Sequence, residues 1–130
     1  MAKTVSPMFA EVLERLQADR KQAAVITGQS PCSIRIFAVV IPDTLGRDGE
    51  PPQDSGQLAI WFQRPGEKVA HGGQNCGELD DILFGLDTTL KGVGSFFFVD
   101  INPLQFLYSR AAAQAGWTLD ESAPTEAPAA

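Results

Sequence analysis

The 130-residue sequence is poor in cysteine and histidine, with two cysteines and one histidine. A structural zinc site needs about four ligands of these two types, and Cys32, His71 and Cys76 are too few. We therefore expect no metal and no cofactor. Because the residues after Met1 lack the apolar core of a signal peptide, we expect a cytoplasmic protein whose cysteines are free thiols.

Long apolar runs and excess positive charge are also missing. No run of about 18 apolar residues is present, so we expect no membrane-spanning helix. Ten Lys and Arg residues against sixteen Asp and Glu residues give a net charge of −6, which argues against direct binding of nucleic acid through a basic face. The apolar content of 44% is too high for a chain disordered throughout.

The segments 32–41 and 57–64 are rich in β-branched and aromatic residues and are predicted to be strands, and 95–101 is the most β-like run in the chain. Before them, Ser6 and Pro7 suit a helix start, and apolar residues at helical spacing predict a helix up to about residue 24. The remaining predicted elements are a possible third strand (67–71), a glycine-rich loop (72–77), a helix (77–86), a strand (95–101) and a helix (104–115).

This element order, α-β-β-(β)-α-β-α, predicts a small single-domain α+β fold with a mainly antiparallel sheet and packed helices. We expect the domain to span residues 6–119, after a flexible N-terminus (1–5) and before a disordered tail (120–130) rich in Ala, Pro and Glu. The strand 95–101 contains three consecutive phenylalanines. It is therefore predicted to be central and covered on both faces.

The segment 42–56 contains glycines, prolines and four acidic residues, and is predicted to be a long acidic hairpin connection. Loops of this length are uncommon and often functional, although a tolerated insertion is an equally simple explanation. Its residues Asp48, Glu50 and Asp54 are candidate contacts for a basic partner.

A catalytic candidate lies in the stretch from His71 to Cys76. Asn75 and Glu78 have the spacing of a capping box, which would put Cys76 at the first helical position, where a thiol pKa can be lowered. His71 could then act as the base of a nucleophilic pair. A half-buried cysteine in an ordinary turn is the simpler alternative.

The same stretch lacks the glycine spacings and the lysine of phosphate-binding loops. The acidic residues that follow, Glu78, Asp80, Asp81 and Asp87, could bind a metal, but acids in a first helical turn are explained by the helix dipole alone. We predict no small-molecule ligand.

The function that these observations favour is a non-catalytic protein–protein interaction module, homodimeric or a subunit of a larger assembly. Three predicted strands are apolar on both faces, so either helices flank both faces or one face contacts a partner. The predicted aromatic anchors are Trp61, Phe62 and Phe97. The alternatives are an acidic inhibitor of a nucleic-acid-binding protein or nuclease, and a small cysteine-dependent enzyme that uses Cys76 and His71.

Overall fold

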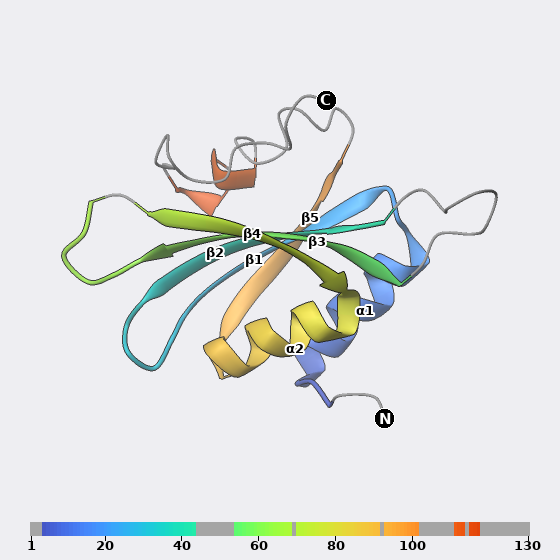
Figure 1. Cartoon of the computed structure of the whole chain (residues 1–130), viewed down its shortest axis with the longest axis horizontal. Helices are drawn as coiled ribbons and strands as arrows, with labels where there is room; N and C mark the ends of the chain where they lie inside the picture. Colours follow the sequence, from blue (N-terminus) through green and yellow to red (C-terminus); the bar gives the residue numbers. More distant parts are fainter. Residues whose placement is uncertain are drawn as a thin grey trace.

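The computed structural model describes residues 4–43, 54–68, 70–91, 93–101, 111–113 and 115–117. Five strands form one antiparallel sheet in the order β4-β3-β2-β1-β5 (Figure 1). This confirms the predicted α+β class, with one strand more than expected. The elements are α1 (Pro7–Ala18), β1 (Gln22–Gln29), β2 (Arg35–Pro42), β3 (Ser55–Gln63), β4 (His71–Glu78), α2 (Leu79–Leu90) and β5 (Gly94–Asp100).

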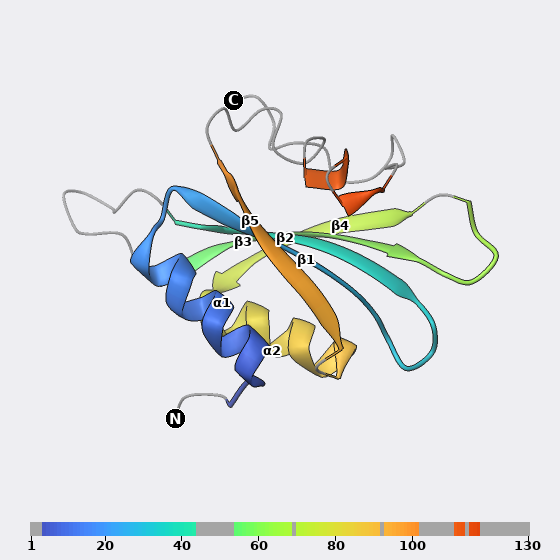
Figure 2. The same ribbon diagram turned by 180° about the vertical axis from the view of Figure 1, so that it is seen from behind.

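Both helices cover the same face of the sheet (Figures 1 and 2). The predicted apolar stripes are confirmed, because α1 buries Phe9, Val12 and Leu16. Burial of each large apolar side chain stabilises the fold by roughly 1.5–3 kcal/mol. The apolar side of α2 consists of Leu79, Ile82, Leu83, Leu86 and Leu90, which pack on Ala24, Ile26, Ile36, Ala38 and Val40 of the sheet.

The opposite face of the sheet has a second apolar core. Phe37 and Trp61 lie there with their ring centroids 5.2 Å apart, and the Trp117 ring is 5.6 Å from Phe37. Ala111 and Ala112 are buried against the same cluster, and residues 111–113 are helical. They fall within the helix predicted over 104–115, of which 104–110 and 114 lie outside the described residues.

The prediction that the first helix extends to residue 24 is wrong. Helix α1 ends at Ala18, and the strand β1 begins at Gln22. Its side chains alternate between the two cores, with Ala23 and Val25 on one side and Ala24 and Ile26 on the other. A strand buried on both faces lacks a polar–apolar alternation, and this hid β1 in the sequence.

Two further expectations about strands are wrong. The glycine-rich stretch 72–77 is not a loop but most of β4, and among the described residues of the strand predicted at 67–71 only His71 belongs to a strand. The phenylalanine-rich strand β5 is not central but lies at an edge, paired only with β1 among the described strands. Strand β1 lies between β2 and β5. Because the sequence did not predict β1 as a strand, β5 was expected at the centre of the sheet.

The acidic connection 42–56 is shorter than predicted, because the strands extend into both of its ends. Pro42 pairs with Gly56, and the Asp43 N–H donates to the Ser55 carbonyl at 2.8 Å. Residues 44–53, like residues 1–3 of the predicted flexible N-terminus and the predicted tail 120–130, lie outside the described residues. Within the described part of the chain, no helix is long and apolar enough to cross a membrane.

Gly56 provides a test of the packing between β2, β3 and α2. A Cβ atom at Gly56 would lie 2.4 Å from the Ile41 carbonyl oxygen and 2.8 Å from Leu79 Cδ2. We expect Gly56→Ala to lower the free energy of unfolding by about 1–3 kcal/mol, measured by chemical denaturation. Gly85, on the exposed side of α2, is the control, because a Cβ atom there would meet nothing within 4 Å. Gly85→Ala is expected to raise stability by about 0.5–1 kcal/mol, and equal effects of the two substitutions would contradict this packing.

Candidate functional site

The two candidate catalytic side chains lie on opposite faces of β4. His71 pairs with Phe62 and Cys76 pairs with Gln57 in an unbroken register. Because side chains alternate along a strand, residues five positions apart point to opposite faces. His71 Nε2 instead lies 3.3 Å from Glu67 Oε2, and the Cys76 side chain is exposed. The structure therefore does not bring His71 and Cys76 together.

The capping-box interpretation of Asn75 is also wrong. Helix α2 begins at Leu79, and its N-cap is Glu78, whose side chain makes no capping hydrogen bond. The Asn75 side chain accepts a hydrogen bond from the Cys76 N–H at 2.9 Å, within the strand. Cys76 therefore lies three residues before the helix and outside its first turn.

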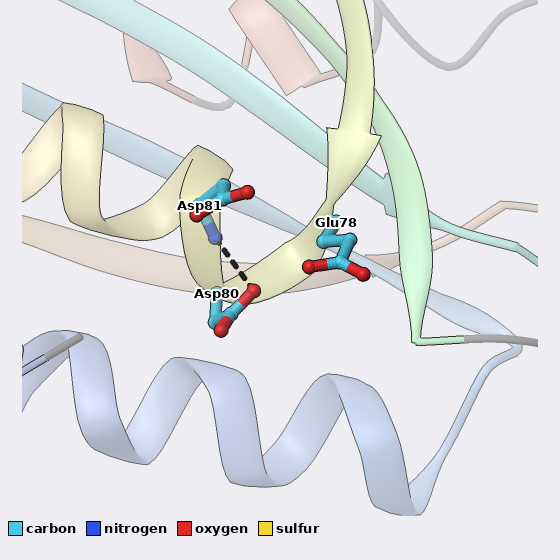
Figure 3. Close-up of side chains that lie close together, drawn as sticks. All are labelled: Glu78, Asp80 and Asp81. Carbon is cyan, nitrogen blue, oxygen red and sulfur yellow. Dashed lines mark hydrogen bonds between the residues drawn. The ribbon is translucent and has the colours of Figure 1, made fainter. Parts of the chain in front are cut away.

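An acidic cluster lies where β4 passes into α2 (Figure 3). The carboxylates of Glu78, Asp80 and Asp81 have oxygens within 4.8 Å of one another. Asp80 Oδ1 accepts the Asp81 N–H at 2.8 Å, and both aspartates lie in the first helical turn, where the helix dipole favours negative charge. The cluster concentrates negative charge at the C-terminal end of β4.

The other acidic candidates are divided between described and undescribed parts of the chain. Asp48 and Glu50 lie outside the described residues. Asp54 accepts a hydrogen bond from Arg20 Nη2 at 2.6 Å, which joins the start of β3 to the turn between α1 and β1. Asp87 accepts the Ser6 N–H at 2.7 Å, so its carboxylate joins the start of α1 to α2.

The three predicted aromatic anchors have different environments. Trp61 is fully buried in the second core and is inaccessible to a partner. Phe62 is 36% exposed on the helix-covered side of β3, close to the β4 edge. Phe97 is half-buried on β5, at the other edge of the sheet. They therefore do not form one surface.

The β5 edge is aromatic and nearly uncharged. Phe96, Phe97 and Phe98 are all half-buried, and the rings of Phe96 and Phe98 meet edge-to-face with centroids 5.7 Å apart. The Arg15 guanidinium carbon lies 3.9 Å from the centroid of the Phe98 ring. At the start of the strand, Val93 is 62% exposed.

The β4 edge has the opposite character, with short and polar side chains. Its sequence is HGGQNCGE, and six of its eight residues are exposed. The edges of the described sheet thus differ in chemistry, one aromatic and one rich in glycine.

Sequence reasoning missed a cleft of about 330 Å³ between the turns that follow β1 and β3. Arg35 extends along it, with Nη1 donating to Gln63 Oε1 at 2.7 Å and its guanidinium carbon 4.6 Å from the Trp117 ring centroid. The register that pairs Arg35 with Gln63 creates this contact, and no motif in the sequence indicates it. Arg64 and Glu67 also line the cleft.

The comparisons with other proteins identify no relative. No family model, curated protein or solved structure matches the chain.

Glu67 provides a pH-dependent test of the turn before β4. The Glu67 carboxylate accepts a hydrogen bond from the Arg64 N–H at 3.0 Å, and this bond lowers the pKa of Glu67. Desolvation raises the same pKa, and the nearby His71 lowers it. A lowered pKa in the folded state stabilises the turn above the ordinary glutamate pKa, and the effect is lost as the pH falls through the lowered value. We expect an NMR titration to place the Glu67 midpoint below that of an ordinary glutamate. In His71→Ala the midpoint should rise only in part, and a complete return to the ordinary value would contradict the dominant role of the Arg64 N–H.

Proposed function

We propose that the protein is a non-catalytic protein–protein interaction module that forms a homodimer through β5. The observation that carries this proposal is the edge position of a strand with three consecutive half-buried phenylalanines. An edge strand presents unpaired backbone N–H and C=O groups, to which another strand can add. A partner that pairs with β5 would satisfy these groups and bury the phenyl rings.

The β5 edge lacks the usual protection against unwanted pairing. Natural edge strands are commonly interrupted by lysine, proline or inward-pointing charges, whereas residues 93–99 contain none of these. An aromatic edge of this kind aggregates unless a specific partner covers it. A closed dimer provides such cover and leaves no β5 edge exposed.

A second copy suits this edge because the strand is self-complementary. Antiparallel pairing about a two-fold axis at Phe97 would place Phe97 opposite its own copy, and Phe96 opposite Phe98 of the other chain. Cross-strand aromatic pairs each contribute roughly 0.2–1 kcal/mol beyond an alanine pair. The five-stranded sheet would continue from one copy into the other, and each core would extend across the axis.

The alternative functions have less support. A cysteine-dependent enzyme would need His71 and Cys76 on one face of β4, and they lie on opposite faces. An acidic inhibitor would contact its partner through the 42–56 connection. Of the three candidate contacts there, only Asp54 lies within the described residues, and its carboxylate is paired with Arg20 at 2.6 Å. That alternative predicts binding to a basic partner that weakens with salt, whereas an aromatic contact tolerates salt.

A charged substitution at the β5 edge tests the proposed dimer. We expect sedimentation equilibrium at micromolar concentration to give a dimer for the wild type. Ser95→Lys should weaken dimerisation at least tenfold, because Ser95 is exposed on β5 and a lysine there opposes strand addition. Gln74→Lys, at an exposed position of the other edge strand, is the matched control and should leave the dimer intact. A monomeric wild type, or dissociation by Gln74→Lys alone, would refute the β5 dimer.

The register of the dimer is tested by a cysteine on the proposed axis. In a Cys32→Ser, Cys76→Ser background, Phe97→Cys should form an intermolecular disulfide under mild oxidation, since directly opposed Cβ atoms lie about 4.5–5.5 Å apart. Val99→Cys lies on the same face of β5 but would oppose Ser95 of the other chain, and should cross-link much more slowly. The measurement is the fraction of cross-linked dimer on a non-reducing gel. Equal cross-linking at both positions would contradict this register.

A further inference from the structure

We infer that the edge of β4 is a second docking site, which takes an extended peptide segment of a partner protein with basic residues at its N-terminal end. The segment would add antiparallel to β4, at the edge of the sheet opposite β5. The inference goes beyond the proposed dimer and does not depend on it. It rests on the glycines of β4, on the apolar side chains beside them and on the charge at the end of the strand.

Gly73 and Gly77 are glycines that the fold itself does not require. Neither has a positive φ, and a Cβ atom at either would meet nothing within 4 Å. By contrast, a Cβ atom at Gly56 on the neighbouring strand would collide with the Ile41 carbonyl. Glycine inside a strand costs about 0.5–1 kcal/mol relative to alanine. Strand glycines often mark a close approach by another backbone or a ligand, and the open space at these two positions fits such an approach.

Apolar side chains of β3 lie beside Gly73 and Asn75 on the helix-covered face of the sheet. The register places Gly73 next to Ile60, and Asn75 next to Leu58. Ile60 and Leu58 are only half-buried, and Phe62 is 36% exposed. A bulky apolar side chain on an added strand opposite Gly73 would lie across the glycine and cover Ile60. The glycine thereby provides space for a side chain that the partner supplies.

The backbone of β4 supplies the affinity in this arrangement. The strand has eight residues, and its register with β3 is unbroken. Strand addition to such an edge gains main-chain hydrogen bonds along its length, while side-chain pockets on one face give specificity. Among the described residues, β4 contains no lysine and no proline that would block the edge.

The charge at the end of β4 selects the partner. An antiparallel segment would begin where β4 ends, beside the Glu78, Asp80 and Asp81 carboxylates. Lysine or arginine at the start of that segment would relieve the repulsion among the three carboxylates. A second copy fits less well, because its own β4 would begin with His71, which already contacts Glu67 at 3.3 Å. Glu67 would then add a fourth carboxylate to the cluster.

The test uses a displayed library of random ten-residue peptides selected on the full-length protein. We expect the selected peptides to carry Lys or Arg in their first positions, followed by apolar residues at alternate positions. A selected peptide, labelled and titrated by fluorescence anisotropy, should bind Gly73→Leu at least tenfold more weakly than the wild type. Because a Cβ atom at Gly73 would meet nothing within 4 Å and glycine inside a strand is destabilising, the variant should unfold at the same or a higher temperature.

Three controls separate this site from its alternatives. Gly85→Ala, with open space on α2, should bind the peptide as the wild type does. Glu78→Gln should weaken the binding of the basic peptide at least threefold, with little effect on a peptide whose basic residues are replaced by glutamine. Ser95→Lys should bind the peptide as the wild type does, even if the β5 dimer is absent or disrupted. Failure of the peptide site can therefore be distinguished from failure of the dimer.

Three results would overturn the inference. The first is a library that yields no binder, or binders without the basic start. The second is unchanged binding to Gly73→Leu. The third is that Gly73→Leu alters the sedimentation of the protein itself, which would make β4 a self-association edge.

Discussion

The structure depends on burying β2 on both of its faces. Every residue from Ile36 to Pro42 is buried, with alternate side chains in the two cores. An antiparallel sheet with a solvated face would not accommodate such a strand. The chain therefore places α1 and α2 on one side and the segment around Ala111 and Trp117 on the other. Strands β1 and β3 flank β2 and extend both cores sideways.

Because the centre of the sheet is fully covered, accessible chemistry is found at its edges. Burial decreases from the centre of the sheet toward β4 and β5, where the side chains are half-buried or exposed. One edge ends in phenyl rings and the other in glycine and amide side chains. In our two proposals, the first edge pairs with a copy of the same strand and the second pairs with a strand of different composition. The two proposed docking sites therefore lie at opposite edges of the described sheet.

Much of the candidate site was hidden in the sequence for physical reasons. The spacing of His71 and Cys76 suggested a catalytic pair, but alternation along β4 places them on opposite faces. Trp61 was an equally good candidate for core and interface, and only the position of Trp117 and Phe37 around it decides for the core. Phe97 was predicted to lie on a central strand, but β5 lies at an edge of the described sheet, because β1 takes the position beside β2.

The α+β class, the apolar sides of α1 and α2 and the strands β2, β3 and β5 could be predicted from the amino-acid sequence, because each follows from local periodicity and β-propensity. That Gln22–Gln29 and His71–Glu78 are strands became clear from the folded structure. The first is apolar on both faces and the second has few apolar residues, so neither has the alternation that marks a strand. The sheet order depends on pairing between residues as distant as Ala24 and Phe98. This pairing forms because β1 and β2 bury both of their faces at the same time. A local sequence pattern does not contain that information.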